Sequence, residues 1–137
     1  METKKLYKIA EREKVSVDFA NIPQSRGFCI NLKGKKFIAV DKNISPESNE
    51  ERVILAHELG HIATDSLYSP DSPALYRRRF ERRADGWAIN QLVPLSLLKK
   101  AIKNGSESVS SLAEHFSVTE EFMQKAIKYY IEQKSVG

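Results

Sequence analysis

The chain has 137 residues, of which 41% are hydrophobic and 29% are charged, a composition typical of a soluble globular protein. Its single cysteine, Cys29, excludes an internal disulfide and suits a reducing compartment. The net charge of +4 is too small to demand a nucleic-acid partner. The charged N-terminus and the absence of a long apolar run predict neither a signal peptide nor a membrane span, so we expect a cytoplasmic protein.

The first third of the chain predicts a helix followed by strands. Residues 3–13 have the apolar spacing of an amphipathic helix. Three β-type runs follow, at residues 15–20, 27–32 and 36–41. The last two runs flank Lys33-Gly34-Lys35, which predicts a hairpin turn. Cys29 lies inside the second run, where we expect a buried small apolar residue.

The rest of the chain predicts helices. Ser48 and Glu51 are spaced as a capping box before an apolar helix that ends near residue 63 and belongs in the interior. After a loop at residues 69–73, a third helix is predicted over residues 74–92. Pro94 at position N1 and Gly105 at C′ delimit a fourth helix. Two more helices are predicted at 109–116 and 120–133, the last with Thr119 as its N-cap.

The order of elements predicts an α+β fold, with a small three-stranded antiparallel sheet packed on a helical bundle. The length favours a single domain over residues 1–137. Within it, residues 1–92 would hold the sheet and the principal helices, and residues 93–137 the C-terminal helices.

The sequence His57-Glu58-Leu59-Gly60-His61 has the pattern H-E-x-x-H inside a predicted helix. Histidines four positions apart lie on the same helix face, so both imidazoles can reach one zinc ion. Glu58 is displaced around the helix and is predicted to activate a water as general base. Gly60 is unfavourable in a helix interior, which indicates close packing or metal access at that point.

A catalytic zinc ion needs a third protein ligand. Leu67 occupies the position of a further histidine in the extended form of the motif, and the remaining histidine is His115. Glu81, twenty positions after His61, can return on the next helix as that ligand, and Asp85 one turn later can hydrogen-bond a ligand histidine. The alternative for Glu81 is an exposed glutamate paired with its arginine neighbours. The alternative for Asp85 is a surface salt bridge.

These motifs, followed by Leu92-Val93-Pro94, resemble the ImmA/IrrE family of small metallopeptidases over about residues 5–131. The resemblance implies a minimal Glu-ligand zincin fold, one Zn²⁺ per chain, and a protein substrate that is a phage or mobile-element transcriptional repressor. Members often have Glu-Ala-Asn where this chain has Arg83-Ala84-Asp85. The pattern E-x-x-A-D assigns the ligand role to Glu81; a ligand at the position of Arg83 would exclude zinc binding in the family manner.

Two further functional features follow from peptide hydrolysis. A second electrophile is expected to stabilise the oxyanion, and its candidates are Tyr68, Tyr76, Arg77 and His115. An extended substrate would pair with a strand edge, for which we predict residues 36–41 because they directly precede the H-E-x-x-H helix.

Weaker signals leave other functions open. Five arginines within seven positions form either a solvated helix face or a docking surface for an acidic substrate: Arg77, Arg78, Arg79, Arg82 and Arg83. Residues 111–127 have a helix-turn-helix rhythm, but Glu120 and Glu121 on the second helix are unsuited to DNA, so direct nucleic-acid binding is not expected. The alternative function is a DNA-binding or protein-adaptor module with a non-catalytic metal site, or an antitoxin-like partner protein.

Overall fold

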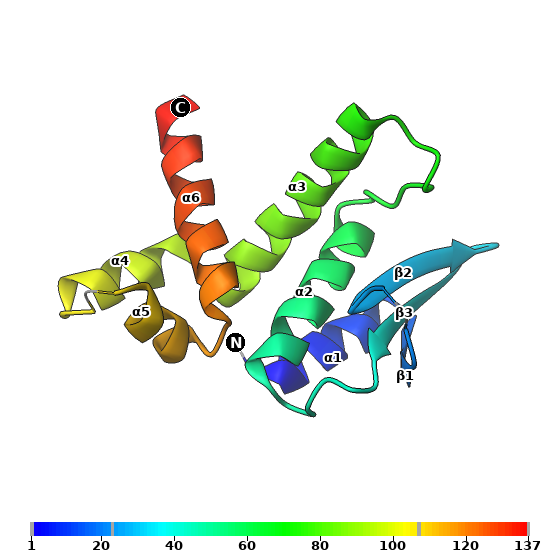
Figure 1. Cartoon of the computed structure of the whole chain (residues 1–137), viewed down its shortest axis with the longest axis horizontal. Coiled ribbons are helices and arrows are strands. Elements are labelled where there is room, and N and C mark those ends of the chain that lie inside the picture. The colour runs from blue at the N-terminus through cyan, green and yellow to red at the C-terminus, as the bar shows by residue number, and fades with distance from the viewer. Residues whose placement is uncertain (1, 23, 107, 137) are drawn as a thin grey trace.

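The computed structural model describes residues 2–22, 24–106 and 108–136. Figure 1 shows the elements in chain order, and they confirm the predicted α+β class. The elements are α1 (Thr3–Arg12), β1 (Val15–Ala20), β2 (Gly27–Leu32), β3 (Lys35–Asp41), α2 (Asn49–Ala63), α3 (Ala74–Leu92), α4 (Leu95–Lys103), α5 (Val109–Phe116) and α6 (Glu120–Val136).

The sheet is mixed, which corrects the expectation of an antiparallel one. Its strand order is β1-β3-β2. β2 and β3 form the predicted antiparallel hairpin through a turn with positive φ at Lys33 and Gly34, but β1 pairs with β3 in parallel. β3 is therefore the central strand, and its Ile38 and Val40 are fully buried.

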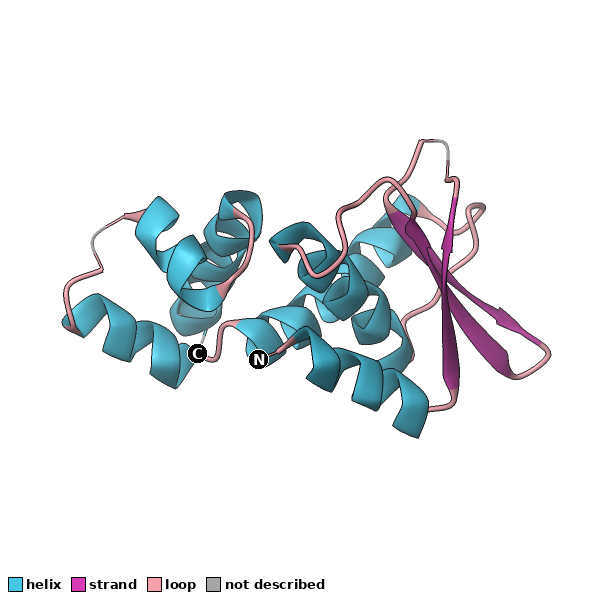
Figure 2. Cartoon of the chain, turned by 90° about the horizontal axis from the view of Figure 1, so that it is seen from below, coloured by secondary structure: helices cyan, strands magenta, loops and turns pink. Residues whose placement is uncertain are grey.

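The helices cover one face of the sheet. α1 and α2 pack against the strands, and Figure 2 shows the helical part on one side of the sheet. Buried side chains from both layers, including Leu6, Leu55 and Leu59, join Ile38 and Val40 in the core. In β2, the side chains of Phe28, Ile30 and Leu32 are exposed.

Gly60 brings α2 and α3 unusually close together. A Cβ atom at Gly60 would lie 2.5 Å from the carbonyl oxygen of Ala84, closer than real Cβ atoms approach. Ala84 itself is fully buried. This contact explains the glycine inside a helix, and it confirms close packing as the reason for it.

The helix ends follow the predicted caps with two differences. Ser48 Oγ accepts a hydrogen bond from the Glu51 amide at 3.1 Å, but the Glu51 carboxylate accepts from Tyr7 Oη at 3.0 Å instead of closing a capping box. Pro94 is the N-cap of α4 and not its first helical residue. Thr119 caps α6 as predicted, since its Oγ1 accepts from the Phe122 amide at 3.1 Å.

Polar contacts join the C-terminal helices to the rest of the chain. Arg52 Nε on α2 donates to the Ser117 carbonyl after α5 at 2.9 Å. Tyr130 Oη on α6 donates to the carbonyl of Val93 at 2.7 Å. In the described part of the chain, none of the helices combines the length and apolarity that a membrane span requires.

Candidate metal centre and active site

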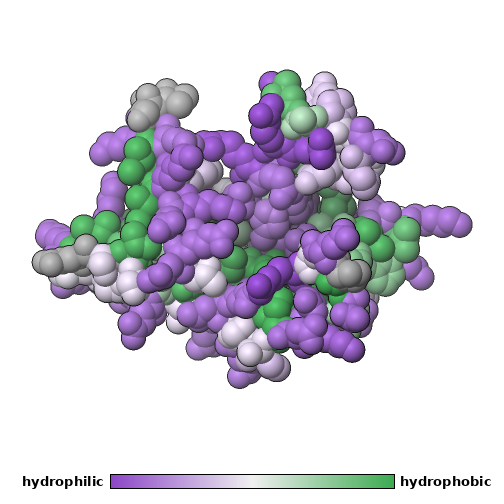
Figure 3. All heavy atoms as spheres, in the orientation of Figure 1, coloured by the Kyte–Doolittle hydropathy of each residue, from purple (hydrophilic) through white to green (hydrophobic). Residues whose placement is uncertain are grey.

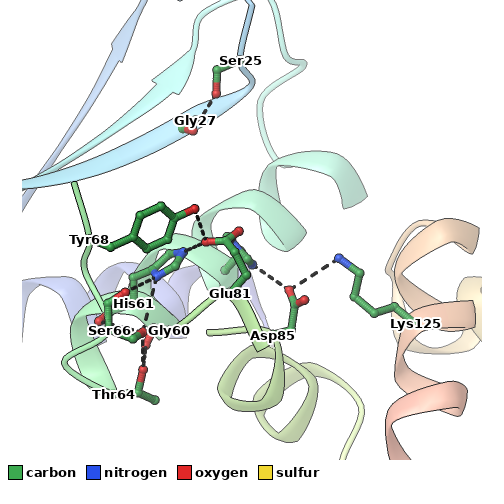
Figure 4. Close-up of polar contacts among 11 residues, drawn as sticks. Ser25, Gly27, Gly60, His61, Thr64, Ser66, Tyr68, Glu81, Asp85 and Lys125 are labelled. Atoms are coloured by element: carbon green, nitrogen blue, oxygen red, sulfur yellow. Dashed lines mark hydrogen bonds and ion pairs between the residues drawn. The ribbon is translucent and has the colours of Figure 1, made fainter. Parts of the chain in front are cut away.

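Two histidines of α2 and one glutamate of α3 converge on a single point. His57 and His61 lie one turn apart, and their ring centroids are 4.8 Å apart. His57 Nε2 lies 3.1 Å from Glu81 Oε1, and His61 Nε2 lies 2.6 Å from Glu81 Oε2. The three donor atoms all fall within 4.8 Å of one another, so one ion can contact them all. Figure 4 shows His61 of α2 and Glu81 of α3 turned toward each other, with Tyr68 and Asp85 nearby.

Each histidine is also held by its other ring nitrogen. His57 Nδ1 lies 2.8 Å from Asp85 Oδ1, and His61 Nδ1 lies 2.9 Å from the carbonyl oxygen of Ser66. A carbonyl only accepts, so His61 Nδ1 carries a proton and Nε2 presents a lone pair in the neutral ring. The Asp85 carboxylate imposes the same tautomer on the neutral form of His57.

The titration of these groups reflects their mutual contacts. Burial lowers the pKa of His57, but its hydrogen bonds with Asp85 and Glu81 outweigh burial and raise the pKa to about 10. Burial raises the pKa of Glu81, yet the hydrogen bonds from His57 and His61 hold it well below its usual 4.5. The Glu81 carboxylate is therefore ionised at neutral pH, whereas His57 carries a proton that a metal ion would displace on binding.

The donor set fits a zinc ion. Two imidazole Nε2 atoms and one carboxylate are a common ligand set of catalytic zinc, and such sites keep one position open for water. The hydrogen bonds from the Nδ1 atoms to Asp85 and to a backbone carbonyl are the usual support for histidines that bind a metal. The same residues that were predicted from spacing are thus brought together, with Asp85 beside His57.

Glu58 lies at the edge of this cluster and is 8% exposed. It lines a cavity of about 460 Å³ together with His57, His61 and Glu81. Burial raises the pKa of the Glu58 carboxyl, and the charge on the neighbouring His57 partly offsets this effect. A carboxylate with a raised pKa is a stronger base at neutral pH, which is what proton transfer from water requires.

The other wall of the cavity is β2 and not β3, so the predicted substrate strand is wrong. Both edges of β3 are paired, whereas β2 lies at the edge of the sheet. Gly27, Phe28 and Ile30 of β2 line the cavity. A Cβ atom at Gly27 would lie 2.7 Å from Ile54 Cγ2, so this glycine lets β2 approach α2 beside Glu58.

The electrophile candidates fall in different places. Tyr68 Oη donates to Glu81 Oε2 at 3.1 Å and lines the cavity. Arg77 lines a neighbouring groove between α3 and α6. Tyr76 is half-exposed near the start of α3 and lines neither hollow. His115 packs edge-to-face on Phe116 and lines a separate cavity.

Arg83 is not among the described residues that line the cavity. Its guanidinium carbon lies 5.3 Å above the ring centroid of Phe80, a cation–π contact on another side of α3. The position that often carries glutamate in the family is therefore outside the set of described residues that line the cavity, whereas Glu81 lines it and lies beside His57 and His61.

Two neighbours of the site were missed by sequence reasoning. The Ser66 carbonyl is a backbone group, and no residue type signals its use. Cys29 was predicted to be a buried apolar residue, but it is only partly buried and lines the cavity beside Glu58. Burial and the Glu58 carboxylate raise the pKa of its thiol, so Cys29 remains protonated at neutral pH. The alternation of side chains along β2 could have predicted that Cys29 faces the helices. It could not have predicted that Cys29 lies opposite Glu58.

Comparison with known proteins agrees with this geometry. Residues 10–128 match the peptidase family M78, described as the IrrE N-terminal-like domain. A comparison with curated proteins gives no match. The matched segment contains both histidines, Glu58, Glu81 and Asp85 and supports a metallopeptidase-type function. The chain therefore belongs to the peptidase M78 family of IrrE N-terminal-like domains.

Proposed function

We propose that this chain is a zinc-dependent endopeptidase that hydrolyses one peptide bond in a specific protein partner. The observation that carries this proposal is the convergence of His57 Nε2, His61 Nε2 and the Glu81 carboxylate beside the buried Glu58. A structural zinc site is closed by four protein ligands and needs no general base. Three ligands with an adjacent basic carboxylate are instead the arrangement of a hydrolytic centre.

Each residue has a role in this proposal. His57, His61 and Glu81 would hold the zinc ion, which when bound supplies a Lewis acid and lowers the pKa of a water toward 7. Glu58 takes a proton from the attacking water and later delivers it to the leaving amine. Tyr68, whose hydroxyl already points at Glu81, is the best-placed candidate to donate a hydrogen bond to the oxyanion.

The substrate would add a strand to the free edge of β2. The backbone groups on that edge provide affinity for an extended peptide, and alternate side chains can then enter the cavity. Phe28 and Ile30 offer apolar surface at the same place.

The partner that we propose is a phage or mobile-element repressor. This proposal rests on the family and not on the geometry. It is tested by incubating the zinc-bound chain with helix-turn-helix repressors from mobile elements of its host. Cleavage by the native chain but not by Glu58→Gln supports a repressor substrate; repressors that stay intact while other proteins are cut would reject it.

The decisive experiment measures zinc content and peptide turnover in four proteins: the native chain, Glu81→Ala, Arg83→Ala and Glu58→Gln. We expect about one zinc per chain in the native protein, in Arg83→Ala and in Glu58→Gln, and loss of zinc in Glu81→Ala. Turnover should fall by about 10²–10⁴-fold in Glu58→Gln, the usual contribution of a general base. Zinc retained in Glu81→Ala would disprove the ligand assignment. Unchanged turnover in Glu58→Gln would disprove its role as base.

A further inference from the structure

The arginine cluster of α3 is divided between two faces of the helix. Arg77, Arg78 and Arg82 line a groove of about 540 Å³ between α3 and α6. Arg79 and Arg83 are not among the described residues that line it. The helical period explains the division, because positions 78 and 82 share a face with Glu81 and positions 79 and 83 lie on another.

The groove adjoins the cavity of the proposed active site. Tyr68 and Glu81 line both hollows, so they mark the point where the two meet. Asp85 also lines the groove, and Lys125 of α6 reaches it at 3.5 Å, as Figure 4 shows. A peptide that extended from the cavity past Tyr68 would therefore reach the groove.

Positive charge predominates along the groove. Five basic side chains line it, against three carboxylates. Glu132 is already engaged by Arg82 at 3.0 Å and by Lys128 at 4.0 Å. In the described part of the chain, no ion pair includes Arg77 or Arg78, so both guanidinium groups are available. Figure 3 shows a notch with hydrophilic walls between α6 and α3.

We propose that this groove binds an acidic segment of the protein substrate beside the scissile bond. The inference rests on the proposed peptidase function and specifies its substrate class. Glu81, Asp85 and Glu132 interrupt the positive surface, which would oppose a continuous phosphate backbone but not a peptide whose carboxylates are spaced apart. Arg77 and Arg78 lie about one turn from Glu81, roughly 5 Å along the helix. An extended peptide spans this distance in about two residues, so the acidic residues should lie about two to five positions from the cleaved bond.

The test starts with a pool of peptides from a proteome digest, incubated with the zinc-bound full chain. Mass spectrometry of the products should show Asp and Glu enriched at those positions. A cleaved peptide is then synthesised in two forms, with its acidic residues present or replaced by Gln or Asn. We expect the acidic form to have the lower KM, and its advantage should shrink as salt rises.

A matched pair of variants locates the effect. Arg78→Glu and Arg79→Glu change the net charge equally, but only Arg78 lines the groove. Arg78→Glu should raise KM for the acidic peptide by on the order of tenfold with little change in kcat, while Arg79→Glu stays within about twofold. Equal kcat/KM for the two peptide forms, or equal effects of the two variants, would overturn the groove assignment.

Binding separates this inference from the peptidase proposal. Fluorescence anisotropy of a labelled Glu-rich peptide, with a Gln-rich peptide as control, requires no turnover. Suppose that no peptide is cleaved, but that the chain binds the Glu-rich peptide and that Arg78→Glu weakens this binding while Arg79→Glu does not. This result would support the groove as a binding site for acidic peptides and would reject the peptidase proposal. Absence of such binding would reject the groove, whatever the result of the cleavage assays.

Discussion

Asp85 holds the His57 ring at the nitrogen that would not bind the proposed metal. Its carboxylate accepts from His57 Nδ1 at 2.8 Å and is also approached by Lys125. We expect Asp85→Ala to weaken zinc affinity by about 10–100-fold, because the ring loses both its orientation and the nearby negative charge. Asp85→Asn should be milder, since the amide oxygen can still accept the same hydrogen bond. Competition with a chelating dye measures both affinities; equal values for Asn, Ala and the native residue would contradict this role.

The residues of the candidate site differ in how well their roles can be predicted from the sequence. His57 and His61 are predictable because a helix places positions four apart on one face. The prediction of Glu81 as a ligand required the further assumption that the next helix runs antiparallel to α2, and α3 does so. The support from the Ser66 carbonyl was not predictable, because it depends on how the chain turns after α2 and not on a side chain.

At the level of the elements, the contact between Gly60 and Ala84 sets the spacing of α2 and α3. A methyl group at Gly60 would meet backbone, whereas one at Gly86 would meet the end of the Tyr129 side chain at 2.7 Å, which can swing aside. Both substitutions to Ala gain about 1 kcal/mol of helix propensity. We expect Gly60→Ala to lower the free energy of unfolding by about 1–2 kcal/mol net and Gly86→Ala to be near neutral. Urea unfolding with a chelator present measures both, and equal effects would contradict the proposed spacing role.

The elements themselves followed from local patterns, but their arrangement did not. Apolar periodicity and turn residues gave the helices and the hairpin at Lys33 and Gly34. The parallel pairing of β1 with β3 depends on which side of the hairpin β1 packs, and the local pattern of residues in β1 does not specify that side. The same pairing makes β2 an edge strand and β3 the central strand. For this reason the prediction of residues 36–41 as the substrate-binding strand was wrong.

For the molecule as a whole, the proposed metal would strengthen the link between α2 and α3, which hydrogen bonds of His57 with Asp85 and Glu81 already join at that point. A ligand that binds only the folded chain stabilises it by about 4 kcal/mol at 1,000 times its Kd. Zinc should therefore raise the melting temperature by on the order of 10 °C, and EDTA should reverse the rise. Glu81→Ala should melt at the same temperature with and without zinc. A zinc-dependent shift that persists in this variant would place the ion elsewhere.

The free edge of β2 has a consequence for the solution behaviour of the protein. An unpaired strand edge with Ile30 and Leu32 exposed on it can pair with the same strand of another copy. Such edges promote aggregation unless nearby charged side chains prevent the pairing. Lys33, Lys35 and Lys36 lie at the turn of the β2–β3 hairpin, next to this edge, where their charges would repel the same residues of a second copy. Salt screens that repulsion, so concentrated protein should remain dispersed at low ionic strength and self-associate as salt is added.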